Sequence, residues 1–84
     1  MIKVLGEEQI MSLDSKLLAR YLRLTDLMIN FGSNLGLPHT KALGQGLFEL
    51  RLKSPDKISR VFYCTRVDKK IVILDVLSES LPNY

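Results

Sequence analysis

Apolar and charged side chains alternate between positions 46 and 53 of the chain. Successive side chains of a β-strand point to opposite faces, so residues two apart share a face. On this pattern one face holds Phe48, Leu50 and Leu52, and the other holds Leu47, Glu49, Arg51 and Lys53. Such a segment predicts a half-buried antiparallel strand with a core side and an open, charged side.

A longer apolar stripe, with a period of three or four residues, precedes this strand. Its members are Leu17, Tyr21, Leu24, Met28 and Phe31. The spacing predicts an amphipathic helix that begins after Ser12 or Asp14 as N-cap and ends at Gly32. The acids at the start of residues 7–13 favour a short helix before it.

Two further apolar runs, at residues 58–67 and 71–77, predict two more strands, and turn residues separate the three strands from one another. The glycine-rich segment 33–46 has the character of a loop. Residues 2–5 could add a short fourth strand. We therefore predict a single α+β domain over residues 1–84, with two N-terminal helices packed on a small antiparallel sheet of three to four strands.

The composition is that of an ordinary globular chain, with 46% hydrophobic residues. No apolar run approaches the roughly 20 residues of a membrane helix, and the start of the chain lacks the apolar core of a signal peptide. These features predict a cytoplasmic protein without membrane contact. A single cysteine, Cys64, and a single histidine, His39, argue against a zinc site. The glycines match neither the P-loop nor the dinucleotide fingerprint, so we expect no metal and no cofactor.

Positive charge is concentrated in the second half of the chain. The net charge is +3, but residues 39–70 hold eight cations against three acids. The cations of the predicted long helix, Arg20 and Arg23 among them, fall on its solvated side. A patch of this kind suits a polyanion such as RNA. A soluble sheet whose edges are guarded by lysines has the same composition, and charge alone does not separate the two interpretations.

The order of these features resembles a known family. Two predicted helices are followed by Leu-Pro-His-Thr-Lys-Ala-Leu-Gly at 37–44, by Gly-Leu-Phe-Glu-Leu-Arg at 46–51 and by Arg-Val-Phe-Tyr at 60–63. In this order they resemble the RelE/HigB superfamily of toxin–antitoxin toxins, and most closely its phage-derived HigB-like branch. The resemblance implies a ribosome-dependent mRNA endonuclease, in which a ribose 2′-hydroxyl attacks the adjacent phosphate without a metal ion. It also implies a cognate antitoxin, of helix-turn-helix type, that holds the enzyme inactive.

The resemblance further implies roles for residues on the predicted strands. Arg51 and Arg60 match positions where the superfamily carries catalytic or phosphate-binding cations, and Glu49 would orient Arg51 or act as a base. The residues expected to contact RNA are Lys41, Lys53, His39 and Tyr63. Other roles stay open: Glu49 as a cross-strand charge partner, Tyr63 as a packing residue, and His39 as a turn residue.

The pattern does not fix the side on which Arg60 lies. Alternation places it with Ile58, Phe62 and Cys64, which look buried. A β-bulge that turns Arg60 toward the face of Arg51, or a place at the rim of the core, would each account for it.

The sequence departs from the family pattern after the last predicted strand. Family members usually continue there with a basic segment, whereas residues 75–84 are acidic and short. Loss of one preorganised transition-state contact costs about 10²- to 10³-fold in rate. The alternative function is therefore a catalytically degenerate, toxin-like module that binds an antitoxin or another protein, and an exposed sheet surface would also suit a homodimer.

Overall fold

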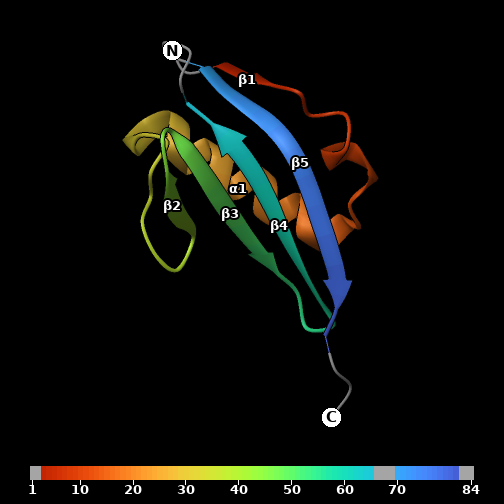
Figure 1. The fold of residues 1–84 in the computed structure, drawn as a ribbon. Coiled ribbons are helices and arrows are strands. Elements are labelled where there is room, and N and C mark those ends of the chain that lie inside the picture. Colours follow the sequence, from red (N-terminus) through yellow and green to blue (C-terminus); the bar gives the residue numbers. More distant parts are fainter. Residues whose placement is uncertain (1–2, 66–69, 82–84) are drawn as a thin grey trace.

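The computed structural model describes residues 3–65 and 70–81. In chain order the elements are β1 (Lys3–Leu5), the 3₁₀ turn η1 (Ile10–Ser12), α1 (Ser15–Phe31), β2 (Thr40–Gly44), β3 (Leu47–Lys53), β4 (Lys57–Cys64) and β5 (Lys70–Ser80). The strands form one sheet in the order β1-β5-β4-β3-β2, in which β1 runs parallel to β5 and the other neighbouring pairs are antiparallel. Helix α1 crosses behind this sheet (Figure 1). In the described part of the chain no helix covers the opposite face, which we call the open face.

The long helix has the ends that the sequence predicts. Asp14 is its N-cap, and its Oδ1 atom accepts a hydrogen bond from the Leu17 N–H at 3.0 Å. The helix ends at Gly32, whose φ of 103° suits glycine and whose N–H donates to the Met28 carbonyl at 2.8 Å. The prediction of α1 and of both its boundaries is confirmed.

The core lies between α1 and the covered face of the sheet. Its buried residues are Ile10, Leu17, Tyr21, Leu24, Met28, Leu50, Leu52, Val61, Tyr63, Ile71 and Ile73. The helix contributes four members of its predicted stripe, whereas the fifth, Phe31, is 76% exposed. Each of β3, β4 and β5 contributes alternate residues. Because the core takes only one side of each strand, the side chains between these residues are left on the open face.

The predicted fold class is wrong in both layers. Over residues 3–65 and 70–81 the structure has one α-helix and a five-stranded mixed sheet, not two helices on an antiparallel sheet of three to four strands. Residues 7–13 form a turn and the three-residue η1 instead of a helix. Ser12 Oγ donates to the Gln9 carbonyl at 2.7 Å, and Asp14 already caps the next helix. So short a segment does not offset the cost of helix nucleation, so it stays a single turn.

Two strands account for the larger sheet. β2 lies in the predicted loop and is an edge strand in which only Thr40 is buried, so it shows no apolar alternation. Its glycines belong to the turn into β3, where Gly44, Gln45 and Gly46 all have positive φ. β1 (Lys3–Leu5) shows that the strand left open for residues 2–5 does form, with Ile2 outside the described residues, and it pairs in parallel with β5.

The three remaining strand predictions are confirmed in type and corrected in length. β3 covers the expected segment. β4 ends at Cys64, before the predicted end at residue 67, which lies outside the described residues. β5 continues beyond residue 77 to Ser80.

Candidate functional site

Arg51 of β3 and Arg60 of β4 are direct cross-strand partners. Residues opposite each other in a sheet have their side chains on the same face. Leu50 and Leu52, which flank Arg51, are buried in the core against α1. Both arginines therefore lie on the open face, where Arg60 is exposed and Arg51 is partly buried.

This arrangement answers the question of where Arg60 points. The residues that share its side, Ile58, Phe62 and Cys64, are only partly buried, whereas the residues between them enter the core. The register shift between β4 and β5 lies between Phe62 and Tyr63, beyond Arg60, so no bulge is needed to bring the two arginines together.

The backbone also brings the two arginines close. The Arg51 N–H donates to the His39 carbonyl at 2.9 Å, on the side away from β4. Arg51 and Arg60 are therefore a non-hydrogen-bonded pair, the kind in which opposite Cα atoms lie about 4.5 Å apart and side chains are closest. Like charges directly opposite each other are destabilising. A bound anion would relieve this repulsion.

Glu49 holds one of the two guanidinium groups. Arg51 Nε donates to Glu49 Oε1 at 2.8 Å. Glu49 is only 8% exposed, and its cross-strand partners are Lys41 on one side and Phe62 on the other. Because this contact uses Nε, the terminal nitrogens of Arg51 are left to bind an oxyanion.

The loop before β2 places His39 beside β3. Gly36 is its centre: with a φ of 77°, its carbonyl accepts the N–H groups of His39 and Thr40 at 3.1 and 3.0 Å. Its own N–H donates to Thr40 Oγ1 at 2.8 Å, and that hydroxyl donates to Asn34 Oδ1 at 3.1 Å. Thr40 is fully buried while His39 is exposed, so the loop is fixed from inside and presents His39 outward.

A cleft of about 530 Å³ lies at the edge of β3 next to this loop. Its residues come from α1, from the loop and from the β3–β4 hairpin, and we call it the basic cleft. Its apolar lining is Leu24, Leu27, Pro38 and Ile58, and its polar lining is Arg20, Arg23, His39, Arg51 and Lys53. None of these lining residues is acidic. The structure thus brings together three predicted site residues, Arg51, Lys53 and His39, and adds two arginines of α1.

A comparison with protein families gives this site a context. A family model described as "Phage derived protein Gp49-like (DUF891)" matches residues 8–78. The chain belongs to this Gp49-like family. The family is RelE/HigB-like and is associated with the toxins of toxin–antitoxin systems, and membership suggests an antitoxin as partner. Comparisons with curated proteins and with solved structures give no significant match.

Two further observations concern the described part of the Gp49-like chain. Among residues 3–65 and 70–81, no helix has the length and apolar character needed to cross a membrane. Within the same residues, no three or more His, Cys, Asp or Glu side chains are grouped so that they could hold a metal ion.

Two of the expected RNA contacts lie outside the basic cleft. Lys41 is exposed on β2, opposite Glu49. Tyr63 is fully buried on the covered face: its ring stacks on Phe48 with centroids 5.4 Å apart, and its hydroxyl donates to the Ser33 carbonyl at 2.7 Å. Burial raises the pKa of Tyr63 to about 12. These surroundings favour the packing role for Tyr63 over stacking on a base.

The Gp49-like protein places two residues in the cleft to which the sequence analysis gave no role. Arg20 and Arg23 are three positions apart, so they share one side of α1. Their spacing and solvated position can be read from the sequence. Which strand they face depends on how α1 crosses the sheet, and no local pattern contains that information.

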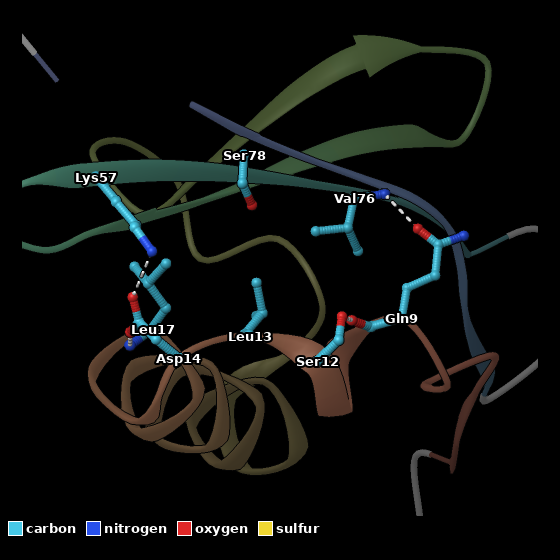
Figure 2. Close-up of a pocket in the computed structure, with 8 residues that line it drawn as sticks. All are labelled: Gln9, Ser12, Leu13, Asp14, Leu17, Lys57, Val76 and Ser78. Atoms are coloured by element: carbon cyan, nitrogen blue, oxygen red, sulfur yellow. Dashed lines mark hydrogen bonds and ion pairs between the residues drawn. The ribbon is translucent and has the colours of Figure 1, made fainter. Parts of the chain in front are cut away.

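A second hollow, of about 290 Å³, lies between the start of α1 and β5 (Figure 2). There Lys57 Nζ lies 3.5 Å from Asp14 Oδ2, and Gln9 Oε1 accepts the Val76 N–H at 3.2 Å. The hydrogen bond from the Leu17 N–H holds the pKa of Asp14 below its usual value. Lys57 is thus paired with an acid on the covered side, although it counts toward the positive charge of its half of the chain. In this second hollow the two charged groups, Lys57 and Asp14, pair with each other. We therefore place the candidate site at the basic cleft and the arginine pair.

Proposed function

We propose that this Gp49-like protein is the toxin of a type II toxin–antitoxin system and a ribosome-dependent mRNA endonuclease of the cytoplasm, in the phage-derived HigB-like branch. The observation that carries the proposal is the pair Arg51 and Arg60, opposite each other on the open face. Two guanidinium groups from directly opposite positions of neighbouring strands suit one phosphodiester group. The proposed partners are a helix-turn-helix antitoxin, the ribosome and mRNA.

The reaction is an internal transesterification that needs no metal. The ribose 2′-oxygen forms a bond to phosphorus, and the bond from phosphorus to the 5′-oxygen of the next nucleotide breaks. The products are a 2′,3′-cyclic phosphate and a 5′-hydroxyl. One proton leaves the 2′-hydroxyl for a base, and solvent water supplies one proton to the departing 5′-oxygen; the resulting hydroxide takes up the proton held by the base, so charge and atoms balance.

Each residue of the site has a role in this step. Arg51 and Arg60 stabilise the charge that develops on the phosphate oxygens. Glu49 orients Arg51 through Oε1, and we assign its second oxygen to accept the 2′-hydroxyl proton. Contacts to the flanking RNA backbone fall to Lys41, Lys53 and His39.

The test is cleavage of a reporter mRNA in a translating extract, with product ends mapped by primer extension and mass spectrometry. The wild-type protein should produce 2′,3′-cyclic phosphate ends, and an mRNA with a 2′-deoxyribose at the cleavage site should resist. Arg51→Ala or Arg60→Ala should each lower the rate by about 10²- to 10³-fold. Lys16→Ala, on the exposed side of α1, is the matched control. Undiminished cleavage by the double arginine variant would contradict this site.

A second candidate function is a toxin-like module that binds an antitoxin without catalysis. It is favoured by apolar side chains that the chain leaves exposed: Leu43, Leu74 and Leu77 are 41%, 51% and 55% exposed. Leu43 and Leu74 also line a hollow of about 520 Å³ together with Leu47 and Cys64. A partner, or a second copy of the chain, could cover this surface.

The two functions give opposite results in one pair of measurements. A binding module forms a stable complex with its antitoxin, leaves growth and mRNA intact when expressed alone, and is indifferent to Arg51→Ala. Leu74→Asp should weaken its complex. An endonuclease arrests growth when expressed alone, and Arg51→Ala removes the arrest.

A further inference from the structure

The basic cleft gathers cations from elements that are distant in sequence. Arg20 and Arg23 reach it from α1, and Lys53 reaches it from the end of β3. The two arginines, three positions apart on one helix, repel each other rather than stabilise α1. Core packing gives no reason for this arrangement, because both arginines are exposed.

Within the described residues, the three cations Arg20, Arg23 and Lys53 form no ion pair. In the described part of the chain the ion pairs are Arg51 with Glu49 and Lys57 with Asp14. Arg20, Arg23 and Lys53 belong to neither pair, and the lining of the cleft contains no carboxylate.

The edge of β3 adds a backbone donor to the same place. The Arg51 N–H points outward to the His39 carbonyl. The Lys53 N–H, two residues further along, points the same way because strand geometry repeats every two residues. β2 pairs with β3 only as far as Thr40 opposite Leu50, so this edge is not covered by β2 at Lys53.

We infer that the basic cleft is a second phosphate-binding subsite, which holds the backbone of single-stranded RNA on one side of the Arg51–Arg60 pair. Its proposed ligands are the phosphate groups next to the scissile one, bound by Arg20, Arg23 and Lys53. The assignment of RNA as ligand rests on the proposed function. The site itself rests on the cluster of cations.

Continuity with the arginine pair favours RNA over an acidic protein segment. Arg51 belongs to both places: it is opposite Arg60 on the open face and it lines the cleft. Arg51 is thus the residue common to the pair and the cleft, and we assign to a bound RNA strand a path from the pair past Arg51 into the cleft. Arginine binds phosphate through two parallel hydrogen bonds, and the apolar floor of Leu24 and Leu27 can take a ribose or the face of a base.

The subsite predicts a specific kinetic effect. Contacts to phosphates that do not react are equally strong before and during the chemical step, so they lower KM without raising kcat. Arg20→Gln and Arg23→Gln should therefore raise KM for mRNA cleavage and leave kcat nearly unchanged, whereas Arg60→Ala lowers kcat.

The deciding experiment measures binding without cleavage. The Arg60→Ala protein, as background, is titrated against a fluorescein-labelled single-stranded RNA between 50 and 200 mM salt, and fluorescence anisotropy reports the affinity. Adding Arg20→Gln and Arg23→Gln should weaken binding at low salt by about tenfold or more. It should also reduce the slope of log K against log salt by about 1.4, since each single-strand phosphate contact contributes about 0.7. Lys16→Gln, an exposed cation of α1 outside the cleft, is the control and should change neither quantity.

Each outcome decides the inference. Unchanged affinity and slope in the Arg20→Gln/Arg23→Gln protein, with its circular dichroism intact, would overturn the subsite. A second result would also overturn it: Arg20→Gln/Arg23→Gln weakens binding of poly-glutamate but leaves binding of RNA unchanged. If they are required for RNA binding but the wild-type protein cleaves no mRNA, the subsite stands and the endonuclease proposal fails. If the double variant does not fold, Arg20→Gln and Arg23→Gln are each measured alone, with the same affinity and salt slope as readout.

Discussion

Arg51 and Arg60 stand opposite each other on neighbouring strands, with both guanidinium groups on the face that α1 leaves open. Because Glu49 already pairs with Arg51, two like charges in this position cost the fold only about a few tenths of a kcal/mol. We expect Arg60→Gln to raise the free energy of unfolding in urea by that amount while it removes activity. Lys16→Gln should change stability by less than about 0.5 kcal/mol. A loss of stability in Arg60→Gln would mean that Arg60 makes a favourable contact instead.

Glu49 and Arg51 should depend on each other for stability. Arg51→Ala removes the cation that pairs with a carboxylate only 8% exposed, and an unpaired buried acid is destabilising. Because the Arg51 side chain is 38% exposed, the effect should be near the lower end of the range for charged hydrogen bonds, about 1.5 kcal/mol.

A double-mutant cycle in urea measures that dependence. Glu49→Gln/Arg51→Ala should be more stable than Arg51→Ala alone, because the glutamine carries no charge to be left unpaired. Strict additivity of the two single effects would show that the contact between Nε and Oε1 contributes nothing to folding.

Tyr63 makes stability fall at high pH. Its hydroxyl is buried and donates to the Ser33 carbonyl, and burial raises its pKa from 10 to about 12. A raised folded-state pKa gives stability that is complete below pH 10 and is lost as pH rises toward 12. Burial raises the pKa of Tyr21 as well, so the loss continues in a variant without Tyr63.

Tyr63→Phe separates the two tyrosines. The variant should lose about 0.5–1.5 kcal/mol at pH 7, because the hydrogen bond to Ser33 is gone, and its stability should fall less steeply between pH 10 and 12. Urea unfolding at several pH values, followed by circular dichroism, checks both effects. Equal slopes in the two proteins would show that Tyr63 ionises as freely in the folded state as in the unfolded chain.

Gly6 should tolerate no side chain. Its φ is 82°, and a Cβ atom there would lie 2.7 Å from the Ile73 carbonyl oxygen in β5. Gly36 has a similar φ of 77° with nothing within 4 Å of its Cβ position. Gly36→Ala should therefore cost only the backbone conformation, about 1–2 kcal/mol, and Gly6→Ala should cost clearly more. Thermal unfolding of the two variants isolates the clash, and equal melting temperatures would argue against the close approach to β5.

The pattern of apolar and polar residues predicted those elements that bury one face and expose the other. α1 has an apolar stripe from Leu17 to Met28, and the apolar and charged residues of β3 alternate from Phe48 to Lys53, so the type of both elements and the face of Arg51 follow from the sequence. Phe62 explains why the sequence could not place Arg60 on one face of the sheet. A phenylalanine in the sequence can be half-buried on an open sheet face or fully buried in the core, and the sequence does not distinguish the two. The register of β4 with β3 does, because it places Phe62 opposite Glu49.

The elements that the sequence did not reveal depend on tertiary contacts. β2 exposes most of its residues and is a strand because β3 offers it hydrogen-bond partners. Residues 7–13 have helical composition but are held as a turn between β1 and Asp14. The basic cleft needs α1 to pass the end of β3, so Arg20 and Arg23 could be placed on a solvated side but not in a site.

The pairing of β1 with β5 joins segments from opposite ends of the described chain. During synthesis, β1 leaves the ribosomal exit tunnel before the other strands and has no strand to pair with until β5 emerges. The β3–β4 hairpin, in contrast, can form as soon as both of its strands have left the tunnel. Pairing between such distant segments is the slow part of folding. For a protein proposed to act on ribosomes, this order of events would delay completion of the sheet, and with it a mature site, until β5 has left the exit tunnel.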